Sequence, residues 1–86
     1  MKGEKTMKWY QAWVSHPTAN AVQLMKHCDP LIQRFGSVPC APDGTPIMEA
    51  DGTIEVRNFG SELGFAMTKN YLQDQGFVIE REQTND

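Results

Sequence analysis

The segment MKWYQAWV, residues 7–14, is rich in aromatic side chains and contains neither glycine nor proline. This composition is typical of a β-strand. Successive side chains of a strand point to opposite faces, so the two tryptophans share one face. The two faces are Trp9, Gln11 and Trp13, and Tyr10, Ala12 and Val14. A shift of one residue in the pairing would exchange them, so the rest of the sheet depends on which face meets the core.

Two interpretations of this strand remain open. Inward-facing tryptophans would be ordinary core residues, because tryptophan is costly to leave in water. The outward interpretation is favoured by Gln11, which fits badly in a core between two tryptophans. It is also favoured by the other face of the strand, which matches Ile54 and Val56 of a later segment in size and polarity.

The next segment has helical periodicity. Ser15 or His16 is a candidate N-cap, and Pro17 suits the first helical position. Apolar residues then recur in steps of three and four: Ala21, Leu24, Met25, Cys28, Leu31, Ile32 and Phe35. Pro30 interrupts this pattern without shifting its phase. The pattern predicts either one kinked helix over 17–35 or two helices, with Asp29 capping the second, and Gly36 ending the segment.

Residues 37–59 carry turn signals and short β-type segments. Turns are predicted at 42–45 and at Asp51-Gly52, with strands over 45–50 and 53–59. Prolines at 39, 42 and 46 place the first of these strands at a sheet edge. The pairing of 37–41 stays open.

A second helix is predicted over 61–75, capped by Ser61 and ended by Gly76. We expect one apolar stripe of this helix to face the sheet and a smaller pair to lie on the other side: Leu63, Ala66, Met67 and Tyr71, and Phe65 and Leu72. The segment FVIERE, 77–82, predicts a last strand with Phe77 and Ile79 on one face and Glu80 and Glu82 on the other.

These elements predict an α+β domain of ferredoxin-like βαββαβ order, with an antiparallel sheet and two helices packed on one face. The first and third strands would lie in the middle. A single domain over 7–82 would have flexible tails at 1–6 and 83–86. In the outward interpretation, the open sheet face carries both tryptophans and several charges: Trp9, Gln11, Trp13, Glu55, Arg57, Glu80 and Glu82.

Composition narrows the functional classes. The 86 residues are 40% hydrophobic and 22% charged, which is ordinary for a globular protein. No apolar run approaches the ~20 residues that a bilayer span needs, so no membrane association is expected. The net charge of −3 and the scattered lysines and arginines argue against nucleic-acid binding. With two cysteines and no export signal, we expect reduced thiols and a cytoplasmic location.

Catalytic motifs are lacking. Four residues with metal-binding side chains do not have zinc-site spacing: His16, His27, Cys28 and Cys40. No Cys–His pair or carboxylate pair stands out as a reactive centre. We therefore expect no metal and no cofactor, and a non-enzymatic role is favoured over catalysis. The residues identify no family.

Three functions remain as hypotheses. The first is a protein-interaction or regulatory module that self-associates through a sheet face containing Trp9, Gln11, Trp13 and Arg57, which suit an interface. The alternative is a small enzyme or ligand-binding domain with a site at a dimer cleft. A second alternative is single-stranded nucleic-acid binding by base stacking. Acidic neighbours on the same face oppose it, and the RNA-recognition motif segment is absent.

Overall fold

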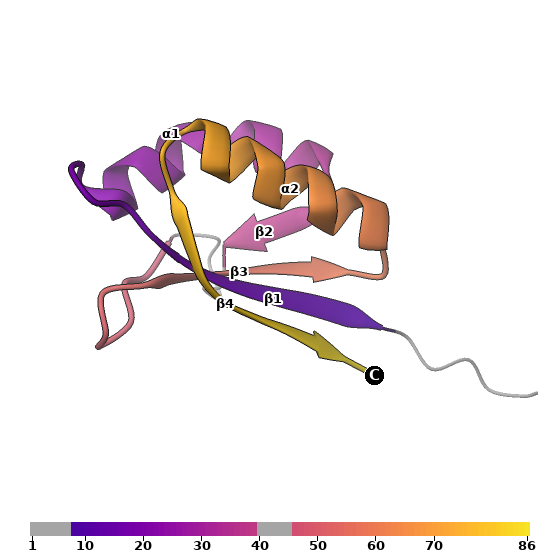
Figure 1. Cartoon of the computed structure of the whole chain (residues 1–86). Helices are drawn as coiled ribbons and strands as arrows, with labels where there is room; N and C mark the ends of the chain where they lie inside the picture. The colour runs from indigo at the N-terminus through magenta and orange to yellow at the C-terminus, as the bar shows by residue number, and fades with distance from the viewer. Residues whose placement is uncertain (1–7, 40–45) are drawn as a thin grey trace, which may run out of the picture.

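The computed structural model describes residues 8–39 and 46–86. It has an α+β fold with a four-stranded antiparallel sheet and two helices, which confirms the predicted class. The elements are β1 (Trp9–Ser15), α1 (Ala21–Arg34), β2 (Ser37–Pro39), β3 (Ile54–Phe59), α2 (Glu62–Asp74) and β4 (Val78–Asn85). The strand order is β2-β3-β1-β4, and both helices lie on the same side of the sheet (Figure 1). The predicted tail at 1–6, the turn at 42–45 and Cys40 lie outside the described residues.

The face of β1 without tryptophan meets the helices. Tyr10, Ala12 and Val14 are buried in the core, and Tyr10 stacks on Phe65 of α2 with ring centroids 5.1 Å apart. Both tryptophans lie on the opposite face and are partly buried. The inward interpretation of the tryptophans is therefore wrong.

Helix α1 begins at Ala21, four residues later than predicted. Its N-cap is Asn20, whose side-chain oxygen accepts the Gln23 N–H at 3.1 Å. The expected caps Ser15 and His16 are therefore wrong. The His16 ring instead forms hydrogen bonds within the loop that precedes the helix. Its Nδ1 accepts the N–H groups of residues 18 and 19, and its Nε2 lies 3.1 Å from the Gln75 carbonyl oxygen.

Pro30 lies inside a single continuous helix, so the alternative of two helices is wrong. Asp29 does not cap a second helix. Its carboxylate instead accepts a hydrogen bond from Gln33, one turn later, at 2.9 Å. Cys28 and Ile32, on either side of the proline, are both buried, as the unbroken phase of the pattern requires. Gly36 follows the helix with a φ of +83°, a conformation that glycine adopts without strain.

The strand predicted over 45–50 is wrong. The edge strand is β2, which pairs with β3 through Val38 and Arg57. In 46–50, only Met48 forms an isolated bridge, with Ile54. The turn at Asp51-Gly52 is confirmed: the Gly52 N–H donates to the Glu49 carbonyl at 2.9 Å.

Helix α2 has the predicted N-cap, since the Ser61 side chain accepts the Gly64 N–H at 2.9 Å. Its predicted inward stripe is wrong. The buried residues of α2 are Gly64, Phe65, Thr68 and Leu72. Leu63 is 72% exposed, and Met67 is also exposed.

Small and polar side chains explain this rotation of α2. A Cβ atom at Gly64 would collide with the Phe35 carbonyl oxygen, so the helix approaches that backbone closely only because residue 64 is glycine. One turn later, the Thr68 hydroxyl lies 2.6 Å from the Ser37 hydroxyl and donates to the Gly64 carbonyl at 2.8 Å. Counting apolar residues misses a contact surface of this kind.

Strand β4 continues to Asn85, past the predicted end at Glu82, so residues 83–85 belong to the sheet and not to a tail. Its pairing with β1 shifts by one residue: Trp13 faces Arg81, whereas Val14 faces Ile79. Glu80 is the extra residue. A bulge of this kind changes which side chains reach each face. Glu82, predicted on the open face, lies on the helix side and pairs with Lys69 of α2 at 2.8 Å.

We predict that Gly64→Ala lowers the free energy of unfolding by about 1–3 kcal/mol because the new methyl group overpacks the helix–backbone contact. In an ordinary helix the same change would stabilise by up to about 1 kcal/mol. Urea unfolding followed by circular dichroism measures the difference. Asn70→Ala, at an exposed position of the same helix, is the control and should be nearly neutral. A stabilised Gly64→Ala protein would contradict the close approach.

Candidate functional site

Nine side chains in three rows form the surface that we call the open face. Each row takes one residue from β3, one from β1 and one from β4, because residues directly opposite in the ladder share a face. The rows are Glu55, Trp13 and Arg81; Arg57, Gln11 and Gln83; and Phe59, Trp9 and Asn85. All four predicted site residues therefore lie together: Trp9, Gln11, Trp13 and Arg57.

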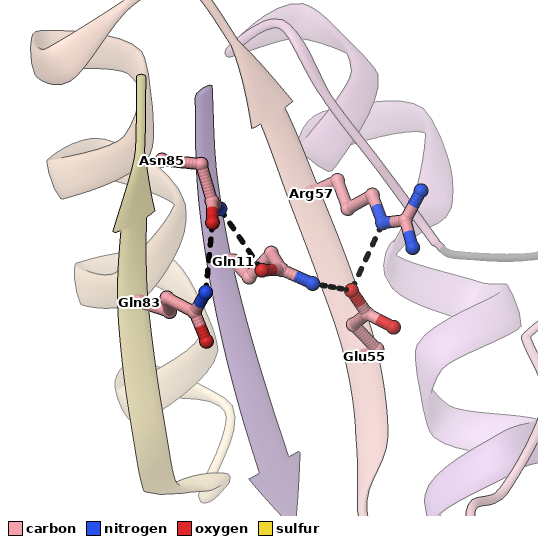
Figure 2. A network of polar contacts seen from close by, with 5 residues as sticks. All are labelled: Gln11, Glu55, Arg57, Gln83 and Asn85. Atoms are coloured by element: carbon pink, nitrogen blue, oxygen red, sulfur yellow. Dashed lines mark hydrogen bonds and ion pairs between the residues drawn. The ribbon is translucent and has the colours of Figure 1, made fainter. Parts of the chain in front are cut away.

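A polar network crosses the centre of the open face from β3 to β4 (Figure 2). The Gln11 side-chain amide donates to the Glu55 carboxylate, which also accepts from Arg57 Nε at 2.9 Å. On the other side, Asn85 donates to the Gln11 side-chain oxygen at 2.9 Å, and Gln83 donates to the Asn85 side-chain oxygen at 2.7 Å.

The middle of this network is hidden from solvent. Gln11 is only 8% exposed and Glu55 only 7%, although both lie on the face away from the helices. Buried polar groups must be hydrogen-bonded to be tolerated, and bonds to an ionised group are the stronger ones. The network therefore holds these side chains in one arrangement across three strands.

Trp9 lies at one end of the network in an aromatic cluster. The ring of Phe59 stacks on it, with centroids 5.7 Å apart and planes 18° from parallel. The Arg57 guanidinium lies 5.2 Å from the centroid of the Trp9 ring. Phe59, the last residue of β3, is 53% exposed.

Trp13 lies at the other end, beneath a second arginine. The Arg81 guanidinium is 4.9 Å from the centroid of its ring. The same guanidinium reaches Asp51, in the turn before β3, at 2.8 Å. Hydrogen bonds from the Thr53 hydroxyl and from Arg81 hold the pKa of Asp51 well below its usual range.

The charges of this region balance locally. Arg57 pairs with Glu55, and Arg81 pairs with Asp51. Glu82 is directed to the helix side, so the face is less acidic than predicted. Glu80 accepts a hydrogen bond from Ser15 at 2.6 Å, beyond the Trp13 row.

Four residues of the open face were missing from the face predicted from the sequence: Phe59, Arg81, Gln83 and Asn85. Phe59 could have been found, because it lies two residues after Arg57 on the same strand and so shares its face. The residues of β4 could not, because the sequence gives no sign of the bulge at Glu80 that brings Arg81 onto this face.

The other candidate side chains do not gather into a reactive centre. Within residues 8–39 and 46–86, no group of three His, Cys, Asp or Glu side chains could hold a metal ion. His27 is exposed on α1, and Cys28 is a buried free thiol. A hydrogen bond with Cys28, together with burial, raises the pKa of Tyr71 to about 12. Cys28 is thus part of the packing between the helices.

Comparison of the chain with protein-family models, with curated proteins and with solved structures finds no match. Neither helix in the described part of the chain is long and apolar enough to cross a membrane.

We predict that Gln11→Met lowers the free energy of unfolding by about 1–3 kcal/mol, because Glu55 and Asn85 each lose a buried hydrogen-bond partner while the side-chain volume is nearly kept. Urea unfolding measures the loss. Gln23→Met, at an exposed position of α1, is the matched control and should change stability little. Equal effects of the two variants would count against the network.

The low pKa of Asp51 predicts a pH-dependent effect of Asp51→Asn. The folded state favours the charged carboxylate more than the unfolded chain does, so its contribution is present above the unfolded pKa of about 3.9. That contribution is lost as the pH falls further. The wild type should therefore melt higher than Asp51→Asn at pH 7, with the gap narrowing toward pH 2.5. A gap independent of pH, measured by thermal unfolding, would refute this role.

Proposed function

We propose that this chain is a small non-enzymatic protein-interaction or regulatory module that self-associates through its open face. The observation that carries the proposal is the pairing of each tryptophan with an arginine on the side of the sheet that the helices leave uncovered. Trp9, Gln11, Trp13 and Arg57 are the central binding residues in this proposal.

The chemistry of the open face supports an interface. Tryptophan and arginine are the residues most enriched among those that dominate binding energy. Here the rings and guanidinium groups are already stacked, and the central amides are already hydrogen-bonded. Association then orders fewer side chains, which lowers its entropic cost. Local charge balance also lets the surface be covered without leaving an unpaired charge.

The sheet edges are less suited to association. At one edge, β2 has only three residues and ends at Pro39. At the other edge, β4 carries Glu80, Arg81 and Glu82 in succession. Short strands, proline and charges are the features that protect edges from pairing. These features favour the open face over an edge as the contact surface.

The architecture is compatible with this use. We propose that the order β2-β3-β1-β4, with both helices on one side, represents the ferredoxin-like arrangement. An antiparallel sheet of this kind can leave one face available for a partner, although the arrangement itself specifies no function. The proposed location is the cytoplasm, which suits the free thiol of Cys28.

Single-stranded nucleic acid is a weaker candidate for the same face. Arg57 and Phe59 already lie against Trp9, and Arg81 lies over Trp13. A base would have to displace these groups in order to stack on either ring. Both arginines also pair with carboxylates, which weakens their attraction for phosphate.

The test is self-association measured by sedimentation velocity over about 1 µM to 1 mM. We expect the wild type to associate and Trp13→Ala to associate about 30-fold more weakly, as is typical when a residue worth about 2 kcal/mol is truncated. Leu63→Ala, which removes a highly exposed apolar side chain from α2, is the matched control and should behave like the wild type.

Two results would overturn the proposal. One is a wild type that stays monomeric at 1 mM, with tryptophan emission unchanged by concentration. The other is salt-sensitive binding to a labelled oligonucleotide that depends on Arg57 and Arg81, which would assign the open face to nucleic acid.

A further inference from the structure

In the rows of the open face, the charged side chains on the β3 side differ from those on the β4 side, and this difference is relevant to self-association. In the Trp13 row, the anionic side chain Glu55 comes from β3 and the cationic side chain Arg81 comes from β4. In the Gln11 row, the cation Arg57 comes from β3 and the neutral amide Gln83 comes from β4. The sheet is therefore chemically different on the two sides of β1.

Two copies packed face to face can be related by a two-fold axis along β1 or by one across it. An axis along β1 places β3 of each copy over β4 of the other and keeps each row opposite itself. Glu55 of each copy then faces Arg81 of the other copy, and Arg57 of each copy faces Gln83 of the other. Each of these contacts is opposite in charge or pairs a charge with an amide.

An axis across β1, through the Gln11 row, places β3 over β3 and reverses the order of the rows. Arg57 then faces Arg57 of the second copy. Glu55 faces the aromatic ring of Phe59, and Arg81 faces Asn85. Like charges that face each other across an interface are costly. In this arrangement neither Glu55 nor Arg81 faces a residue of opposite charge.

Resting on the proposed self-association, we propose that the occupant of the open face is a second copy of this chain, related by a two-fold axis that runs along β1. The two sheets pack in the aligned manner, with strand directions within about 30° of each other. Trp9 and Trp13 lie near the axis, opposite the same residues of the second copy.

The exposure of the charged groups fits this arrangement. The Arg81 side chain is 50% exposed, so it can reach across to the second copy while it stays over Trp13. The Glu55 side chain is only 9% exposed and keeps its bonds to Gln11 and Arg57. Its charge therefore acts on Arg81 of the second copy through the interface, where water is excluded and attraction is stronger than in solvent.

Arg81 supplies the test, because the two arrangements place it opposite different groups. With the axis along β1, Arg81→Glu sets a carboxylate opposite Glu55 of the second copy. It should weaken self-association about tenfold more than the neutral variant Arg81→Gln does. In the Glu55→Gln background, this difference between the two Arg81 variants should disappear. Sedimentation velocity gives all four association constants, and circular dichroism verifies that each variant is folded.

Cross-linking gives an independent measurement. Val38 of β2 lies opposite Arg57 on the open face and is two strands away from β1. With the axis along β1, the two copies of Val38 are about 20 Å apart, from strand spacings of about 4.8 Å and a sheet separation of about 10 Å. With the axis across β1 they come within about 10 Å. A thiol-specific cross-linker that spans about 10 Å should therefore yield no linked dimer of Val38→Cys in a Cys40→Ser background, whereas the axis across β1 predicts one.

The outcomes separate this inference from the function on which it rests. A monomeric wild type overturns both. A wild type that self-associates through Trp13, but in which Arg81→Glu and Arg81→Gln are equally weakened, overturns only the two-fold axis along β1. Rapid cross-linking at Val38→Cys also overturns only that axis, and it favours β2 packed on β2.

Discussion

The register of β1 is the constraint on which the rest of the structure depends. Tyr10, Ala12 and Val14 fill the space beneath the helices with an aromatic ring, a methyl group and a branched side chain. Because side chains alternate along a strand, that choice places Trp9 and Trp13 on the other side of the sheet. A single-residue shift would place two indole rings under the helices and move Tyr10, Ala12 and Val14 to the open face. The core and the candidate site are thus two consequences of the same pairing.

The bulge in β4 is the second constraint, and it acts on the open face alone. Without the extra residue at Glu80, the alternation that buries Ile79 beside Val14 would send Glu82 to the open face and Arg81 to the helix side. The bulge reverses this. It gives Trp13 its arginine, and it gives Lys69 of α2 a carboxylate partner. One extra residue therefore changes the charge on both faces of the strand, because a bulge redirects the side chains that follow it.

The sequence predicted the fold class, the cap of α2 and the turn at Asp51-Gly52, because each depends on local chemistry. It left both registers of β1 open, because that choice depends on packing against helices that are distant in the chain. The rotation of α2 was mispredicted because its contact surface uses Gly64 and Thr68, which carry no apolar signal. The start of α1 was predicted too early because His16 and Pro17 are typical of a helix N-terminus, whereas in the structure the His16 ring bonds to the loop before the helix.

The burial of Gln11 and Glu55 connects stability with the candidate function. The buried carboxylate of Glu55, opposite Trp13, needs partners, and it takes them from Gln11 and Arg57. Gln11 in turn holds Asn85 at the far end of β4. These bonds fix the polar side chains of three strands before any partner arrives. A surface that has already desolvated its central charge has less to lose when a second sheet covers it. The same network leaves Arg81 as the charged side chain of the open face best placed to select the orientation of the proposed second copy.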